Sequence, residues 1–277
     1  MDRTRACAAT HGSCGALKVT AILFSHRPYA ETAATFDWRQ GPVKYYTATG
    51  LVGCAFAYES ARRTRNVIGM SEWPDDIYTE PQEDPDTLAN LGPLAPMAGI
   101  WRGDDGVDVK PKPDGPRSQA YVEYLALQPI DAQTNGPQLL YGLRYHARMT
   151  KPQLKKTYHD QVGYWMWEPA TERIYHSLTI PRGQAALAAG HATPAARQFT
   201  LRATRGDTAF GIVSNPFLEQ AFRTEAFEIT VTIGDDDTWS YDETTTLLIK
   251  GQAEPFLHTD SNRLIRVGPP QPNPRSA

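Results

Sequence analysis

The sequence predicts an all-β protein, a closed antiparallel up-and-down β-barrel of about ten strands over residues 93–267. Three observations predict it. Segments of alternating side chains follow one another closely, and short Gly, Asp or Pro turns separate most of them. No long stretch with a helical period lies between these segments. Several of them are apolar or aromatic on both faces, which suits a barrel with a partly apolar lumen.

The expected strands are 97–103, 119–128, 138–149, 157–168, 173–180, 184–189, 198–204, 225–233, 239–250 and 262–267. A short turn of helix at 86–91 precedes them, and Gly92 and Pro93 are its stop signal. One or two further helical turns are expected at 217–222, after Asn215-Pro216.

The segment T-Y-H-D-Q-V-G-Y-W-M-W-E at 157–168 carries the most informative face. Alternation along a strand puts a histidine, an amide, a glycine and two indoles on one side: His159, Gln161, Gly163, Trp165 and Trp167. A glycine inside a strand often marks the close approach of a ligand or of another backbone. The face is therefore either the wall of a ligand pocket or a Trp-rich core with a hydrogen-bonded histidine.

The next strand, 173–180, adds a second histidine to the same wall. His176 shares its face with Ile174, Leu178 and Ile180. A lone histidine in an apolar row is usually a core residue whose hydrogen bonds are satisfied. One hairpin from His159, however, it is expected to face the same lumen.

The first 69 residues differ from the rest of the chain. They hold nine Lys/Arg against four Asp/Glu, whereas residues 70–277 carry a balance of −8. They also hold all three cysteines, Cys7, Cys14 and Cys54. We interpret 1–69 as a non-native or disordered extension with Met70 as the natural start, 70–92 as an extended arm, and 268–277 as a Pro-rich tail.

Composition and charge argue against nucleic acid and membrane as partners of the barrel. An acidic body does not favour a nucleic-acid groove, and no apolar run approaches the roughly 18 residues of a membrane span. The barrel has no thiol for a disulfide, a zinc site or a nucleophile. We expect a cytoplasmic protein that takes a small molecule into its lumen and binds neither nucleic acid nor membrane, with a homodimer left open as its assembly.

Three motifs, in order, resemble those of the nitrobindins, haem-binding β-barrels with a lipocalin or fatty-acid-binding-protein-like shape. Gly99-Ile-Trp101-Arg-Gly103 resembles the family's G-x-W-x-G strand. H-D-Q-V-G-Y-W from His159 resembles its H-x-E-x-G strand. P-F-L-H-T-D-S-N-R-L-I-R from Pro255 is similar to its closing strand, although the part after His258 is longer and more polar than usual. The chain looks like a less-studied bacterial branch of the family.

The resemblance implies a haem b cofactor and a set of site residues. His258 matches the proximal iron ligand, with Asp260 as a candidate hydrogen-bond partner. His159 matches a distal-pocket histidine, and His176 falls at another pocket-facing position; these two are the catalytic candidates. The cofactor-binding set implied is Trp101, Gly103, His159, Gly163, Trp165, His176, Ile249 and His258, with Trp101 at the closed end of the barrel.

The function implied is chemistry of a ferric haem on reactive nitrogen species, namely NO binding and isomerisation of peroxynitrite to nitrate. A second interpretation is a non-enzymatic carrier of an apolar, fatty-acid-like ligand, whose carboxylate Arg144 would bind. A third is a barrel whose lumen is filled by its own side chains.

Overall fold

The computed structural model describes residues 19–22, 33–36, 74–153 and 156–273. In the first two ranges, β1 (Val19–Ile22) and β2 (Ala33–Phe36) pair antiparallel in a two-stranded sheet of their own. The sequence predicts no strand within residues 1–69, so this pair of strands differs from the prediction. The predicted start at Met70 and the three cysteines lie outside the described residues.

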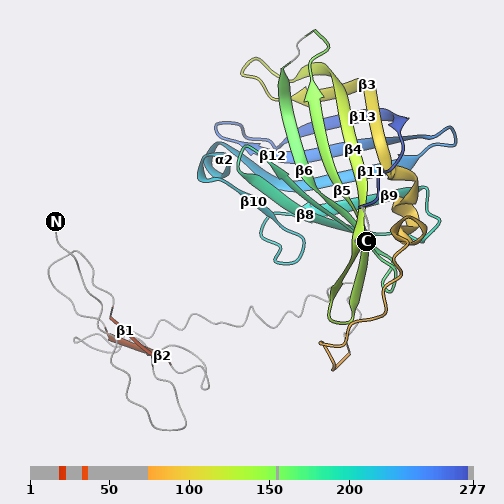
Figure 1. The fold of residues 1–277 in the computed structure, drawn as a ribbon. Coiled ribbons are helices and arrows are strands. Elements are labelled where there is room, and N and C mark those ends of the chain that lie inside the picture. The colour runs from red at the N-terminus through yellow and green to blue at the C-terminus, as the bar shows by residue number, and fades with distance from the viewer. Residues whose placement is uncertain (1–18, 23–32, 37–73, 154–155, 274–277) are drawn as a thin grey trace, which may run out of the picture. The chain divides into compact units, whose positions relative to one another are not determined.

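The other strands form one antiparallel sheet that closes on itself (Figure 1). Its eleven strands follow the order β10-β8-β7-β6-β5-β4-β3-β13-β12-β11-β9. A further pairing of β8 with β9, through Ala189 and Arg202, closes a ring of ten strands, to which β10 is added beside β8. The predicted ten-stranded closed barrel is therefore confirmed.

The strands of the barrel are β3 (Gly99–Lys110), β4 (Arg117–Asn135), β5 (Gln138–Thr150), β6 (Thr157–Glu168), β7 (Arg173–Ile180), β8 (Gln184–His191), β9 (Gln198–Thr204), β10 (Ile212–Ser214), β11 (Phe222–Ile233), β12 (Thr238–Ile249) and β13 (Phe256–Gly268). Three of them, β6, β7 and β9, have the predicted bounds. β3 runs further than expected, β13 begins earlier, and β10 is not among the predicted strands.

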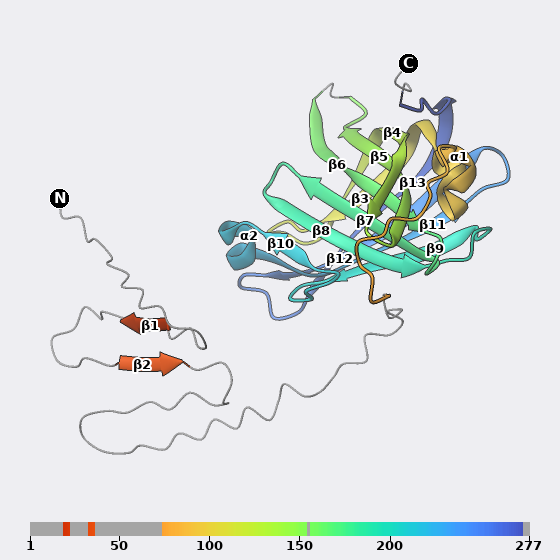
Figure 2. The same cartoon turned by 60° about the horizontal axis from the view of Figure 1, so that its bottom comes forward.

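Short helices lie at opposite ends of the barrel (Figures 1 and 2). At one end are α1 (Thr87–Asn90) and the 3-10 helix η1 (Gly92–Met97), and at the other end is α2 (Pro216–Ala221). Asn215 caps α2, because its side chain accepts hydrogen bonds from the backbone of Phe217 and Leu218. No helix among the described residues is long and apolar enough to cross a membrane.

Trp101 anchors the core at the end that α1 and η1 cover. Its side chain is 1% exposed, and its indole N–H donates to the carbonyl of Met97 at 2.8 Å. The ring of Trp239 meets it edge-on at 6.1 Å, and the guanidinium of Arg266 lies 4.3 Å from the centroid of the Trp101 ring. The indole therefore ties η1 to β3, β12 and β13.

Replacing Trp101 by alanine is expected to destabilise the barrel by about 3–5 kcal/mol, as large-to-small aromatic changes in cores do. The cost arises because the cavity left behind borders three strands and η1. Chemical denaturation of the variant and the parent measures it. A free-energy change near zero would contradict the packing role given to this side chain.

Removing residues 1–69 is expected to leave a cooperatively folding barrel, because every strand of the large sheet begins after residue 98. Thermal unfolding of the truncated and full-length chains, followed by circular dichroism, tests this. A large fall in the melting temperature of the truncated chain would show that the segment contributes to the core.

Candidate functional site

A cavity near the α2 end of the barrel has a volume of about 340 Å³. Much of its lining is apolar, and these side chains include residues of β7, β8, β10, α2, β11 and β12: Leu178, Ile180, Ala186, Ile212, Leu218, Phe222, Phe227 and Leu247. Its polar lining includes two of the predicted histidines, His159 and His258. A cavity of this size and mixed lining suits one small organic ligand.

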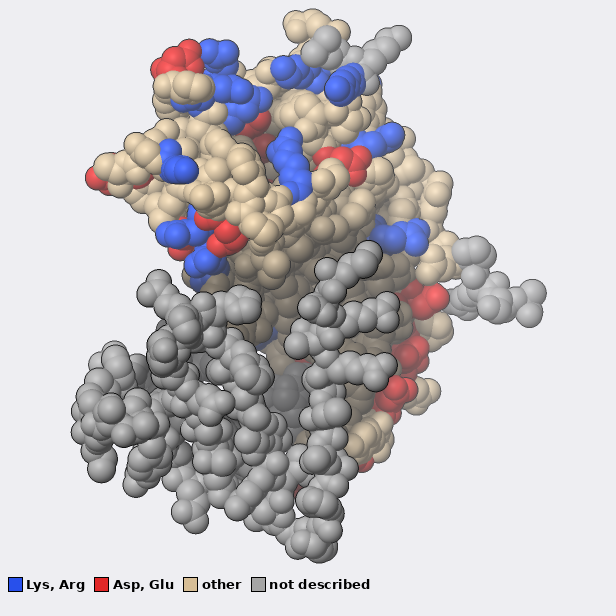
Figure 3. All heavy atoms as spheres, turned by 90° about the vertical axis from the view of Figure 1, so that its left-hand side faces the viewer, with Lys and Arg blue, Asp and Glu red and all other residues tan. Residues whose placement is uncertain are grey.

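The lumen holds a group of carboxyl side chains. On the face shown in Figure 3, basic and acidic side chains of the described residues are mixed among uncharged atoms. Inside the barrel, by contrast, four carboxyl groups border the cavities: Asp108, Glu123, Glu243 and Asp260. The electrostatics of the site therefore depends on which of these groups are ionised.

His258 faces the cavity because β13 alternates regularly through this region, so that His258, Asp260, Asn262 and Leu264 all turn inward. The longer stretch after His258 does not reverse this facing. An irregularity in the pairing of β13 with β3, between Ser261 and Ile265, takes up the offset between the two strands.

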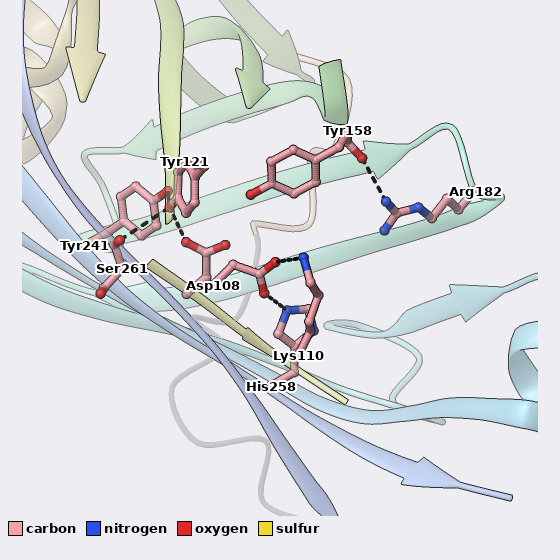
Figure 4. A network of polar contacts seen from close by, with 9 residues as sticks. Asp108, Lys110, Tyr121, Tyr158, Arg182, Tyr241, His258 and Ser261 are labelled. Atoms are coloured by element: carbon pink, nitrogen blue, oxygen red, sulfur yellow. Dashed lines mark hydrogen bonds and ion pairs between the residues drawn. The ribbon is translucent and has the colours of Figure 1, made fainter. Parts of the chain in front are cut away.

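Asp108, on β3, is the partner of His258 (Figure 4). Its Oδ1 lies 2.8 Å from Nε2 of the imidazole, and its Oδ2 is 3.2 Å from the ammonium of Lys110. Burial alone would raise the pKa of Asp108, but His258 and Lys110 outweigh it and hold the pKa below its usual value. Asp260, the predicted partner, instead accepts a hydrogen bond from Tyr121.

The other three carboxyls have raised pKa values. Burial raises the pKa of Glu123 to about 7, although Asn262 and Tyr241 donate to it at 3.0 and 2.9 Å. Burial likewise raises the pKa of Asp260 to about 7. Glu243 pairs with Asp260 across β12 and β13, and burial together with its acidic neighbours raises its pKa well above the usual value.

A chain of hydrogen bonds connects the two histidines of β6 and β7. His159 Nε2 lies 3.3 Å from the Gln161 carbonyl oxygen, and the Gln161 amide donates to the Tyr145 hydroxyl at 2.8 Å. That hydroxyl is 3.0 Å from His176 Nε2. Burial lowers the pKa of both histidines, that of His176 to about 3, so both imidazoles are neutral at physiological pH.

His176 is nevertheless a core residue more than a pocket residue. It is 1% exposed and stacks on Trp165, with ring centroids 3.8 Å apart. It borders only a smaller inner cavity of about 50 Å³, which His159, Gln161, Glu243 and Asp260 share with the main cavity. The structure thus brings His159 and His258 to one cavity and sets His176 behind them.

The remaining predicted residues lie elsewhere. Trp165 borders the inner cavity, whereas Trp101 and Gly103 pack in the core near Trp239 and Asn262. A Cβ on Gly163 would collide with the carbonyl oxygen of Ser177, so this glycine allows a close backbone approach. Ile249, at the end of β12, does not border the main cavity in the described structure, although Leu247 does.

Arg144 is exposed on the outside of β5, between buried Leu143 and Tyr145. The predicted contact of this arginine with a ligand in the lumen is therefore wrong. Two other cations border the main cavity instead: Lys110, at the end of β3, and Arg182, which donates to the carbonyl of Tyr158 at 2.9 Å.

Tyr158 also borders the cavity, although simple alternation along 157–168 turns it outward. The pairing of β5 with β6 is irregular here: Met149 faces His159, and Thr150 faces Thr157. This bulge leaves Tyr158 without a partner on β5 and lets two consecutive side chains line the cavity. Sequence alternation carries no signal for such a bulge.

Comparison with known proteins identifies a domain family and a solved structure to which this chain is similar. A family model described as "THAP4-like, heme-binding beta-barrel domain" matches residues 90–266, more than half of the chain. A solved protein described as "Crystal Structure of Rv2717c from M. tuberculosis" is 21% identical, with a TM-score of 0.44, and the match covers 65% of this chain and 97% of that one. No curated protein matches the chain.

The buried acids predict a loss of stability above neutral pH. The pKa of Glu123 is higher in the folded state than its ordinary value of 4.5, so its contribution is fully present below about pH 4.5 and is lost as pH rises through about 7. Glu123→Gln stays neutral throughout and keeps an acceptor for Tyr241. Its fall in melting temperature between about pH 5 and about pH 8.5 should therefore be smaller than that of the parent.

Asp131→Asn is the matched control, because Asp131 lies exposed on the same strand. It should follow the parent at every pH. Equal pH dependence of the parent and Glu123→Gln would contradict the burial of a neutral acid at position 123.

Proposed function

The chain belongs to the THAP4-like family of haem-binding β-barrel domains, so its cofactor is haem, and we propose that this is haem b, held in the main cavity by His258. The resemblance to the nitrobindins is thereby confirmed at the level of family and fold. The observation that carries the proposed site is the position of His258, which borders a cavity with a largely apolar lining.

The residues present fit a porphyrin in three respects. An apolar wall of eight side chains from β7 to β12 offers van der Waals contact to a large flat ring. His258 supplies the single imidazole that haem iron commonly takes from the protein. Lys110 and Arg182 border the same cavity, where a cation attracts the carboxylates of a porphyrin.

The raised pKa values of the lumen acids also favour this ligand. An ionised carboxylate against an apolar ring carries a large desolvation cost, and a neutral carboxyl carries much less. Glu243 and Asp260 border the cavity, and burial raises the pKa of both. The raised pKa values therefore reduce the negative charge that these two groups place beside His258 near neutral pH.

We assign the ligand-facing role in the same cavity to His159. When bound, a ferric haem supplies a Lewis-acidic iron that takes NO or peroxynitrite and promotes conversion of peroxynitrite to nitrate. His159 borders the cavity as a neutral imidazole, and its Nε2–H, which points to the Gln161 carbonyl oxygen at 3.3 Å, would turn from Gln161 to donate to a small anion bound there. Hydrogen-bond donors placed at developing negative charge supply the protein's part of such a rearrangement.

His176 takes a supporting role in this proposal, because it reaches the cavity only through other side chains. Its Nε2 contacts the Tyr145 hydroxyl, which accepts from Gln161. It therefore helps to fix Gln161 and, through it, His159. The cytoplasmic location, the homodimer and the peroxynitrite isomerase activity all stay predictions.

The second candidate is a carrier of an apolar acid. The specific observation in its favour is the combination of the apolar wall with the cations Lys110 and Arg182 on one cavity. Such a ligand would need neither His258 nor His159. The two functions are therefore distinguished by the histidines.

Hemin titration followed by the Soret band tests the haem site. His258→Ala is expected to abolish the band of the bound form, because it removes the iron ligand. His159→Leu is expected to keep haem loading within about twofold but to change the rates of NO binding or peroxynitrite decay by about tenfold or more, the scale at which a single hydrogen-bond donor acts in catalysis.

His146→Leu is the matched control, since His146 is exposed on the outer face of β5. It should behave as the parent. If His159→Leu loses haem and His258→Ala keeps it, the proximal and distal roles are reversed. If none of the variants alters a haem spectrum while the parent binds a fluorescent fatty acid, the protein is instead a carrier of an apolar acid.

A further inference from the structure

The contact between His258 and Asp108 has the geometry of a ligand imidazole with its supporting carboxylate. Asp108 Oδ1 lies 2.8 Å from His258 Nε2, and the Asp108 side chain is only 7% exposed. Among the described residues no hydrogen bond occupies the other ring nitrogen, Nδ1. One nitrogen of the ring is thus held by a buried anion and the other remains for a second ligand.

The two residues are brought together by strand register. β13 pairs with β3 so that Thr259 faces Val109 and Asp260 faces Asp108. The His258 side chain, two positions from Asp260 on the same face, therefore reaches Asp108 diagonally across the two strands. Both backbones are fixed in the barrel wall, so the contact is set by the fold.

Lys110 completes the arrangement from the far side of the carboxylate. Its ammonium lies 3.2 Å from Asp108 Oδ2, the oxygen that does not contact His258. Figure 4 shows the carboxylate between the lysine and the imidazole. Asp108 is thus a carboxylate with one oxygen reserved for each partner, whereas Glu243 and Asp260, deeper on the same wall, contact no cation in the described structure.

We propose that Asp108 is a positioning residue for the haem iron: it accepts the ring N–H of His258, gives the imidazole partial imidazolate character, and thereby stabilises ferric over ferrous iron. The inference rests on the proposed role of His258 as iron ligand. It goes further by assigning to Asp108 a part in setting the redox state and the strength of the iron–histidine bond.

The chemistry follows from proton sharing along the hydrogen bond. A carboxylate that accepts from one ring nitrogen fixes the tautomer and raises the basicity of the other. A more basic nitrogen donates more electron density to the metal, and the higher charge of ferric iron gains more from this than ferrous iron does. Hydrogen bonding to an axial ligand is one of the ways in which a protein tunes a haem.

Lys110 limits the effect of Asp108 on the imidazole of His258. Its charge on the far oxygen holds part of the negative charge of Asp108 away from the imidazole. Removing it with Lys110→Met, which keeps most of the stem, should strengthen the pull on the ring N–H. The lysine and aspartate variants are therefore expected to shift the reduction potential in opposite directions.

The test uses the full-length, haem-loaded protein and readouts that need no turnover. Asp108→Asn should shift the ferric-to-ferrous equilibrium about tenfold toward ferrous iron, which is about 59 mV for a one-electron couple. The iron–histidine stretching band in resonance Raman spectra should move to lower frequency. Haem loss should become about tenfold faster, the scale of effect seen for supporting partners of metal ligands.

Asp104→Asn is the matched control. Asp104 lies on the same strand, β3, loses the same formal charge, and is exposed beside Arg102. It should leave the potential, the Raman band and the rate of haem loss unchanged.

A second experiment isolates the hydrogen bond and does not depend on the folding of Asp108→Asn alone. His258→Gly is reconstituted with hemin and either imidazole, which has an N–H for Asp108, or 1-methylimidazole, which has none. The two complexes should differ in potential and Raman band. That difference should disappear in His258→Gly/Asp108→Asn.

The outcomes separate this inference from the proposed function. If wild-type protein shows no Soret band, or if His258→Ala keeps it, the haem site itself is wrong. If His258 binds the iron but Asp108→Asn matches the parent in potential and Raman band, the role of Asp108 is overturned. That role is also overturned if imidazole and 1-methylimidazole differ equally with and without Asp108.

Discussion

Closure of the sheet is the constraint on which the rest of this structure depends. The pairing of β8 with β9 turns ten strands into a ring, and every second side chain of each strand then shares one enclosed volume. Residues far apart in the chain, such as Asp108 on β3 and His258 on β13, become neighbours in that volume. The buried carboxyl groups cannot reach bulk water, so each keeps its charge only where partners inside the barrel offset the cost of burial.

Much of the fold could be predicted because most strands keep a regular alternation and end at recognisable turns. This holds for β6, β7 and β9, whose bounds match the prediction. The differences have local physical causes. The sequence does not predict the first six residues of β13, because the inward residues there, His258 and Asp260, are polar and resemble a loop. β10 has only three residues and depends on β8 for its pairing.

The candidate site was predictable where it depends on alternation and unpredictable where it depends on register. Alternation and the family motifs identify His159, His176 and His258 as inward-facing. They do not identify Asp108 as the partner of His258, because that contact depends on how β3 and β13 are aligned across an irregular pairing. Alternation assigns Tyr158 to the wrong face for the same kind of reason, since a bulge in β6 turns it into the cavity.

The four carboxyls of the lumen differ in charge because they differ in partners. Asp108 has His258 on one oxygen and Lys110 on the other, and these two partners overcome the effect of burial on its pKa. Glu123 has neutral donors only, and Glu243 has acidic neighbours, so burial prevails and raises the pKa of both. Asp108, beside the imidazole of His258, is therefore the lumen acid that stays ionised at the lowest pH. A lumen arranged in this way combines an apolar surface for a large ring with one fixed negative charge at the histidine that would hold its metal.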